Sequence, residues 1–176
     1  MAPIRPRSLV LILLAASAGI GGLAFGMLPH PSQPGAPPHA AANADVVDAQ
    51  PAQVAVVDAA TLRLQDRVVR LLGVDAPVRG ATCQARDGVG FDCGAAATNA
   101  LAALVRETPV ACRLNGHDEL GRPYGVCEAS GRDLNRAVIA AGWARADRAL
   151  PRLKHDEDTA RTERRGLWAA APSATW

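Results

Sequence analysis

Two charged side chains that could do chemistry lie close together at the end of an apolar segment. Arg70 stands inside the run Val68–Val74, and Asp75 follows where that run stops. An arginine and a carboxylate near one strand end can hold a phosphate, help to hold a metal ion, or pair with each other as a structural ion pair. Residue types and spacing alone leave these three roles open.

The elements that must position these side chains are short strands. Apolar, β-branched runs cover Val54–Val57, Thr61–Leu64 and Val68–Val74, with polar or small residues between them. Alternation of apolar and polar residues in the second and third runs fits strands that bury one face. We therefore expect three consecutive strands, the third of which ends just before Asp75.

The rest of the chain predicts two more strands and three helices. The expected strands are Val110–Leu114 and Tyr124–Glu128, and the expected helices are Gly94–Arg106, Leu134–Ala141 and Arg152–Arg165. Asp92 and Asp133 are suited to cap the first two helices. Five strands with a helix after the third predict an α+β fold dominated by a five-stranded barrel of the OB type.

Four cysteines lie in this region and predict two disulfide bonds in an exported domain. No pair has the C-x-x-C spacing typical of zinc sites. Cys83 and Cys93 bracket a glycine-rich loop, whereas Cys112 and Cys127 lie on two apolar runs around a polar turn. Three pairings are possible. The loop and the expected hairpin favour Cys83–Cys93 and Cys112–Cys127.

The charge distribution argues against tight, unspecific binding of nucleic acid. The formal net charge is +2, and Arg5 and Arg7 account for it, so the chain from Asp45 onward has as many acidic as basic residues. A dedicated nucleic-acid binder usually carries a clear basic excess. Aromatic side chains that could stack on bases are few and are not grouped. We expect weak nucleic-acid binding or none.

The N-terminal segment has the features of a membrane anchor. Residues 1–8 contain two arginines and precede Leu9–Leu28, which is uncharged and mostly apolar. As a helix this segment would be about 30 Å long, enough to cross the hydrocarbon layer. A cleaved signal peptide is the rival interpretation, because Ala16-Ser17-Ala18 has the A-x-A pattern. We favour an inner-membrane anchor, since cleavage there would leave only a short apolar core.

Both interpretations place the folded region outside the cytoplasm, either held in the periplasm or secreted. The proline-rich residues 29–44 are typical of a semi-extended tether. The expected domain covers residues 45–168, and residues 169–176 form a tail.

Short motifs follow one another in a specific order from Val54 to Trp168. They are the strand segment already described, Asp92–Ala96, Leu120-Gly121-Arg122, Asp133-Leu134-Asn135, Ala141-Gly142-Trp143-Ala144 and Arg165-Gly166-Leu167-Trp168. In this order and spacing they resemble the thermonuclease family, that is, the staphylococcal-nuclease-like domains. The resemblance implies an OB-type barrel and a site for calcium-dependent hydrolysis of phosphodiesters in nucleic acid.

The resemblance also implies roles for individual residues. Arg70 matches the arginine of the family's R-L-x-G-x-D-x-P motif, and Arg122 matches that of its Y-G-R motif. Such arginines bind the phosphate and offset the charge that grows on it in the transition state. Asp75 matches a metal-binding aspartate. Asp58 matches the first aspartate of the family's D-G-D-T motif, which is not the direct ligand.

Other parts of the family's catalytic site are missing. The metal-binding aspartate of D-G-D-T falls on Ala60, the glutamate that activates water falls on Val78, and Leu120 replaces the tyrosine of Y-G-R. Calcium takes six to eight oxygen ligands, so Asp75 and Asp58 would make a weak or vestigial site. We expect no cofactor, or calcium if the chain is active.

Three functions are compatible with these residues. The first, which we favour, is a catalytically impaired module that binds an anionic ligand or a protein partner through Arg70 and Arg122. The second is an active calcium-dependent nuclease that uses Asp58 and Asp75 as an altered ligand set. The third is a structural module of an envelope assembly.

Overall fold

The structure is a computed structural model that describes residues 46–170. The segment Leu9–Leu28, for which the sequence predicts an anchor, lies outside the described residues. Within residues 46–170, no helix combines the length and the apolar character needed to cross a membrane.

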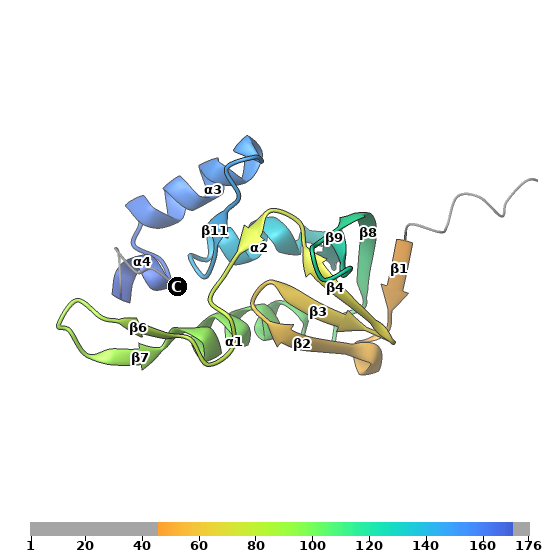
Figure 1. The fold of residues 1–176 in the computed structure, drawn as a ribbon, viewed down its shortest axis with the longest axis horizontal. Helices are drawn as coiled ribbons and strands as arrows, with labels where there is room; N and C mark the ends of the chain where they lie inside the picture. Colours follow the sequence, from red (N-terminus) through yellow and green to blue (C-terminus); the bar gives the residue numbers. More distant parts are fainter. Residues whose placement is uncertain (1–45, 171–176) are drawn as a thin grey trace, which may run out of the picture. The chain divides into compact units, whose positions relative to one another are not determined.

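The strands of this part of the chain form one mixed sheet and two small two-stranded sheets (Figure 1). The main sheet has the order β1-β8-β9-β4-β3-β2, and β10 pairs with β9. Its pairings are antiparallel except for β4 with β9, which is parallel. Its members are β1 (Val46–Ala49), β2 (Val54–Asp58), β3 (Thr61–Leu64), β4 (Arg67–Leu71), β8 (Val110–His117), β9 (Pro123–Ala129) and β10 (Arg132–Asp133).

The two edge strands of the main sheet, β1 and β2, are neighbours in the chain. Only the short helix η1 (Pro51–Gln53) separates them. The side chain of Gln65, which follows β3, donates a hydrogen bond to the carbonyl of Asp48 in β1, with 2.6 Å between the atoms. Both links draw the edges together, so the sheet curves in the manner of an OB-type barrel. The expected α+β class is confirmed, whereas β1, β10 and the short strands β6 (Thr82–Gln84), β7 (Gly90–Asp92) and β11 (Arg145–Ala146) are additions that the sequence pattern did not predict.

The four α-helices in the described residues are α1 (Cys93–Val105), α2 (Leu134–Ala140), α3 (Pro151–Thr162) and the short α4 (Leu167–Ala170). Three of them are close to the predicted segments, and the fourth, α4, was not predicted. Carboxylates of Asp92 and Asp133 accept hydrogen bonds from the third backbone N–H after each of them, which confirms both predicted caps.

The core lies between the sheet and the first two helices. Leu62 and Leu71 of the sheet, Leu101 of α1, and Leu134 and Ile139 of α2 are completely buried. Burial of each such side chain stabilises the fold by roughly 1.5–3 kcal/mol. α2 also packs against α3, and α3 against the strand β11 (Arg145–Ala146). This packing brings the C-terminal third of the chain to the barrel.

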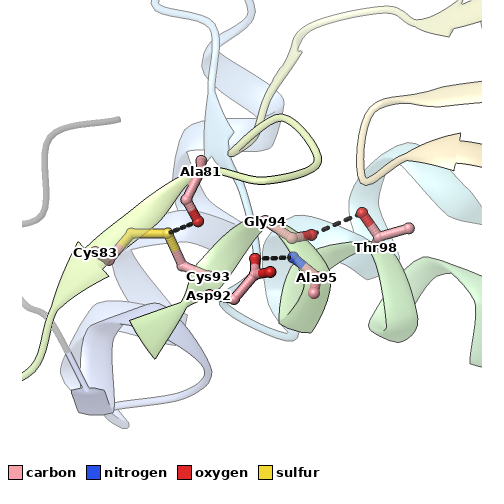
Figure 2. The surroundings of a disulfide bond; sticks show 7 residues. All are labelled: Ala81, Cys83, Asp92, Cys93, Gly94, Ala95 and Thr98. Atoms are coloured by element: carbon pink, nitrogen blue, oxygen red, sulfur yellow. Dashed lines mark hydrogen bonds between the residues drawn. A yellow bond between two sulfur atoms is a disulfide. The ribbon is translucent and has the colours of Figure 1, made fainter. Parts of the chain in front are cut away.

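Both predicted disulfides are present. Cys112 and Cys127 are directly opposed in the β8–β9 ladder, with 4.0 Å between their Cα atoms. Cys83–Cys93 joins the hairpin of β6 (Thr82–Gln84) and β7 (Gly90–Asp92) to the start of α1 (Figure 2). Figure 1 shows this hairpin extending away from the main sheet. The disulfide therefore closes a segment that has little core of its own.

The chain passes very close to the start of α1 beside this disulfide. A Cβ atom at Gly94 would lie 2.0 Å from the carbonyl oxygen of Val78, so only glycine fits there. The Gly94 carbonyl accepts a hydrogen bond from the hydroxyl of Thr98 over 2.7 Å (Figure 2). The first turn of α1 thus holds the loop that follows Asp75.

The prediction of one continuous strand over Val68–Val74 was wrong. β4 ends at Leu71, and β5 (Val74–Asp75) belongs to another ladder, with β11. Gly73 lies between them with a φ of +75°, a left-handed conformation that favours glycine. A Cβ atom at Gly73 would come within 2.3 Å of Cδ1 of Leu150, so the chain bends where the start of α3 packs on it.

Candidate anion-binding site

Two short ladders bring Arg70 and Asp75 to one place. Arg70, in β4, is opposite Tyr124 of β9 in the parallel register. Asp75, in β5, is opposite Arg145 of β11 in the antiparallel register. Directly opposed residues of an antiparallel pair have Cβ atoms about 5 Å apart, so Arg145 is the cation nearest to Asp75 along this ladder. The bend at Gly73 is what allows both ladders to meet.

These residues line a hollow of about 480 Å³, which we call the arginine hollow. Its charged and aromatic lining consists of Arg70, Asp75, Tyr124, Arg145, Asp147 and Arg148. Three guanidinium groups outnumber two carboxylates, and the hollow therefore favours anions. The planar fork of a guanidinium matches the oxygen atoms of phosphate or carboxylate in pairs.

The guanidinium of Arg70 is available to a ligand. Within residues 46–170, the ion pairs closer than 4.0 Å include neither Arg70 nor Asp75. Their pairing with each other as a structural ion pair, one of the roles that the sequence left open, does not occur. Asp147 is engaged with backbone instead, because its Oδ1 accepts a hydrogen bond from the Ala149 N–H over 2.9 Å.

Arg122, the second predicted site arginine, lines a different hollow. It lies just before β9, two residues ahead of the tyrosine that faces Arg70. Its Nε donates to Oδ2 of Asp118 over 2.7 Å. Partial burial alone would raise the pKa of the Asp118 carboxyl, but hydrogen bonds from Arg122 and from the Leu120 backbone outweigh that effect and lower the pKa. Arg122 is thus fixed to its own hairpin.

The hollow beside Arg122 measures about 570 Å³, and we call it the bulge hollow because it adjoins an irregularity in β8. Its polar and charged lining consists of Arg67, Asn115, His117 and Arg122. The structure therefore brings Arg70 together with Asp75, and Arg122 together with Arg67, in two separate hollows.

A comparison with models of protein families identifies the family of this chain. The model described as staphylococcal nuclease homologue matches residues 68–170, more than half of the chain. The chain belongs to this family. A search among curated proteins found no match. Membership agrees with the OB-type strand order and with the motifs that contain Arg70, Asp75 and Arg122.

The family implies calcium, and the residues of this staphylococcal nuclease homologue do not fit it. The position of the second metal-binding aspartate carries Ala60, whose methyl group is 2% exposed in the core. Oδ1 of Asp58 accepts a hydrogen bond from the Ala60 N–H over 2.9 Å, which commits this carboxylate to the turn. Within residues 46–170, no three histidine, cysteine or acidic side chains come close enough together to hold a metal ion.

The resemblance places the family's activating glutamate at Val78. Val78 stands at its position and is 59% exposed, and an isopropyl group can neither orient a water molecule nor accept its proton. Leu120, in place of the motif's tyrosine, is 77% exposed at the tip of the β8–β9 turn.

Sequence reasoning missed Tyr124, Arg145 and Arg148 as lining residues of the arginine hollow. The signal that could have found Arg145 is the alternation Ala144-Arg145-Ala146-Asp147, in which both alanines are buried and the charged residues are not. Such alternation is typical of a half-buried strand. This alternation is only four residues long, and the partner strand β5 has two residues. The sequence alone therefore gives only weak evidence for a strand here.

Proposed function

We propose that this staphylococcal nuclease homologue binds a phosphate-bearing anion in the arginine hollow and does not hydrolyse phosphodiester bonds. The observation that carries the proposal is the buried methyl group of Ala60 at a metal-ligand position, beside a hollow that keeps the phosphate-binding Arg70.

The binding half of the proposal rests on the charge and geometry of the hollow. Arg70 and Arg148 present guanidinium groups from β4 and from the segment after β11, so an anion between them receives hydrogen bonds from two sides. Tyr124 adds a hydroxyl group in the same hollow. Asp75 and Asp147 oppose the binding of highly charged polymers, which agrees with the equal numbers of acidic and basic residues in the domain.

The loss of hydrolysis follows from what the site lacks. Cleavage of a phosphodiester needs a cation or donors that stabilise the developing charge and a base that prepares the attacking water. Arg70 can supply part of the first requirement. Ala60 and Val78 remove the second oxygen ligand and the base at the positions where the family has them. A bound phosphate would therefore be held and not attacked.

We further propose that the domain is tethered to the outer face of the inner membrane by Leu9–Leu28 and the proline-rich residues 29–44. The two disulfides support this location, since such bonds persist in oxidising compartments. The ligand in the arginine hollow would then be an anionic group carried by a molecule or a protein partner of that compartment.

The test of lost hydrolysis uses the full-length chain in detergent. We expect no saturable heat of calcium binding and no calcium-stimulated cleavage of single-stranded DNA. Clear calcium-dependent cleavage that Asp75→Ala abolishes would contradict the proposal and favour an active nuclease with an altered ligand set. The variant Ala60→Asp with Val78→Glu restores both lost groups, and we expect it to gain calcium binding.

The test of binding measures the affinity for inorganic phosphate by calorimetry. Arg148→Gln should weaken binding about tenfold, because it removes a charge-assisted contact. Arg106→Gln is the matched control, since this exposed arginine at the end of α1 is not among the residues that line the hollow. Equal affinities of the two variants would contradict the assignment of the site.

A further inference from the structure

We propose that the bulge hollow is a second, independent anion site, and that it takes a phosphate monoester with an apolar body. This second site goes beyond the function proposed for the arginine hollow, because other residues line the bulge hollow. Arg122 belongs to the Y-G-R motif, but Asn115 and His117 lie outside every motif of the family resemblance, and the resemblance gives Arg67 no role.

The charged lining of the bulge hollow is entirely basic. Arg67 and Arg122 supply guanidinium groups, His117 an imidazole and Asn115 an amide, and no acidic residue is among its lining residues. By contrast, two aspartates line the arginine hollow. A doubly negative phosphate monoester matches several donors that line one hollow.

Arg122 is held in position for such a ligand. Its Nε is bonded to Asp118, whose other oxygen accepts hydrogen bonds from the backbone N–H groups of Arg122 and Leu120. Within residues 46–170, the terminal nitrogen atoms of Arg122 make no further hydrogen bond or ion pair. A side chain that is fixed before binding loses less conformational entropy when the ligand arrives.

An irregularity in β8 forms the wall of the hollow. The register of β8 against β9 shifts between Leu114 and His117, and Gly116 has a φ of +70°. A β-bulge of this kind bends the strand and redirects side chains, and bulges are common beside functional sites. Asn115 of this irregular stretch lines the hollow together with Arg67, which comes from the start of β4.

The remaining lining suits an apolar group. Val68, Leu114 and Pro123 are half-buried and line the same hollow as the basic side chains. Small-molecule sites have volumes of roughly 300–1,000 Å³ and combine apolar walls with a few polar groups. The bulge hollow, at about 570 Å³, has this size and this mixture.

The experiment titrates phenyl phosphate into the ¹⁵N-labelled full-length chain in detergent micelles and follows backbone amides by NMR. We expect the Gly116 and Gly121 amides to shift and saturate, and Arg67→Gln to weaken this curve about tenfold. Arg148→Gln should leave it unchanged within twofold. Inorganic phosphate, which has no apolar body, should bind at least fivefold more weakly at these amides.

Each hollow has its own readout, so failure of one proposal is distinguishable from failure of the other. The Gly73 and Asp147 amides report on the arginine hollow, whereas Gly116 and Gly121 report on the bulge hollow.

Absence of saturating shifts at Gly116 and Gly121 would overturn the proposal, as would equal affinities of the wild type and Arg67→Gln. Equal affinities for phenyl phosphate and inorganic phosphate at these amides would overturn the ligand class. Arg67→Lys, which keeps the charge but not the planar fork, should fall between the wild type and Arg67→Gln.

Discussion

The side-chain amide of Asn135 donates a hydrogen bond to the backbone carbonyl of Leu72, with 2.9 Å between Nδ2 and the oxygen. The same nitrogen donates to the Gly125 carbonyl over 2.9 Å, and Oδ1 accepts from the Cys127 N–H over 3.0 Å. Asn135 is 2% exposed. One buried side chain therefore joins α2 to β9 and to the bend between β4 and β5, and so supports the arginine hollow.

Asn135→Ala should lower the free energy of unfolding by about 3 kcal/mol, because it removes three hydrogen bonds that a buried side chain makes to the backbone. Urea unfolding measures the change. Asn99→Ala, an exposed position on α1, should stay within about 0.5 kcal/mol of the wild type. A similar small effect at Asn135 would contradict the importance of these bonds.

Gly73→Ala should destabilise the chain for two reasons, a left-handed φ and a clash of the new methyl group with Leu150 and Leu153. We expect a loss of about 3 kcal/mol. Gly80→Ala separates the two causes, because Gly80 has a φ of +86° but no atom within 4 Å of an added Cβ. It should lose only about 1 kcal/mol in thermal unfolding. Equal losses in the two variants would show that packing at Gly73 is unimportant.

Local signals predicted the parts of this fold that depend on nearby residues. Asp92 and Asp133 bind backbone N–H groups within their own helices, so the residue type and its place before a helix were sufficient. The disulfide Cys112–Cys127 followed from a hairpin that the chain forms between neighbouring strands.

The arginine hollow could not be predicted in the same way. The β5–β11 ladder has two residue pairs separated by about seventy residues of chain, and two-residue strands show no periodicity. The family motifs identified Arg70 and Arg122 as a pair, but hydrogen bonds to Asp118 place Arg122 in another hollow. Leu150 and Leu153 pack against Gly73, where the chain bends after β4, and sequence patterns do not report this contact.

Glu157→Gln should destabilise the chain by about 3 kcal/mol, although it preserves the size of the side chain. Glu157 is 3% exposed, and its carboxylate accepts hydrogen bonds from the Ala146 N–H and from Arg161. A glutamine amide nitrogen cannot accept either bond. The same variant should weaken phosphate binding in the arginine hollow, because the bond to Ala146 anchors β11.

Asp158→Asn is the matched control on the same helix. Asp158 pairs with Lys154 at the surface and should contribute less than about 0.5 kcal/mol. Chemical unfolding at neutral pH compares the two variants, and equal midpoints would show that Glu157 does not anchor α3 to β11.

Two double variants, each with both cysteines of one disulfide replaced by serine, should affect different parts of the molecule. The Cys112–Cys127 bond is buried between two strands of the main sheet, so its loss should lower global stability by about 3 kcal/mol. Loss of Cys83–Cys93 should mainly release the β6–β7 hairpin. Hydrogen exchange distinguishes them: we expect faster exchange throughout the sheet in the first variant and faster exchange confined to residues 82–92 in the second. The opposite pattern would contradict this assignment.

Asp118→Asn should reduce stability at neutral pH and alter the response to acid. Hydrogen bonds from Arg122 and Leu120 lower the pKa of the folded carboxyl, so its contribution is present above the unfolded pKa and is lost as the pH falls through the folded value. The difference in unfolding free energy between wild type and variant should therefore be largest near pH 7 and shrink below about pH 4. Urea unfolding at several pH values measures it, with Glu119→Gln as an exposed neighbouring control. A difference that stays constant down to pH 2 would contradict a stabilising role for the charged carboxylate.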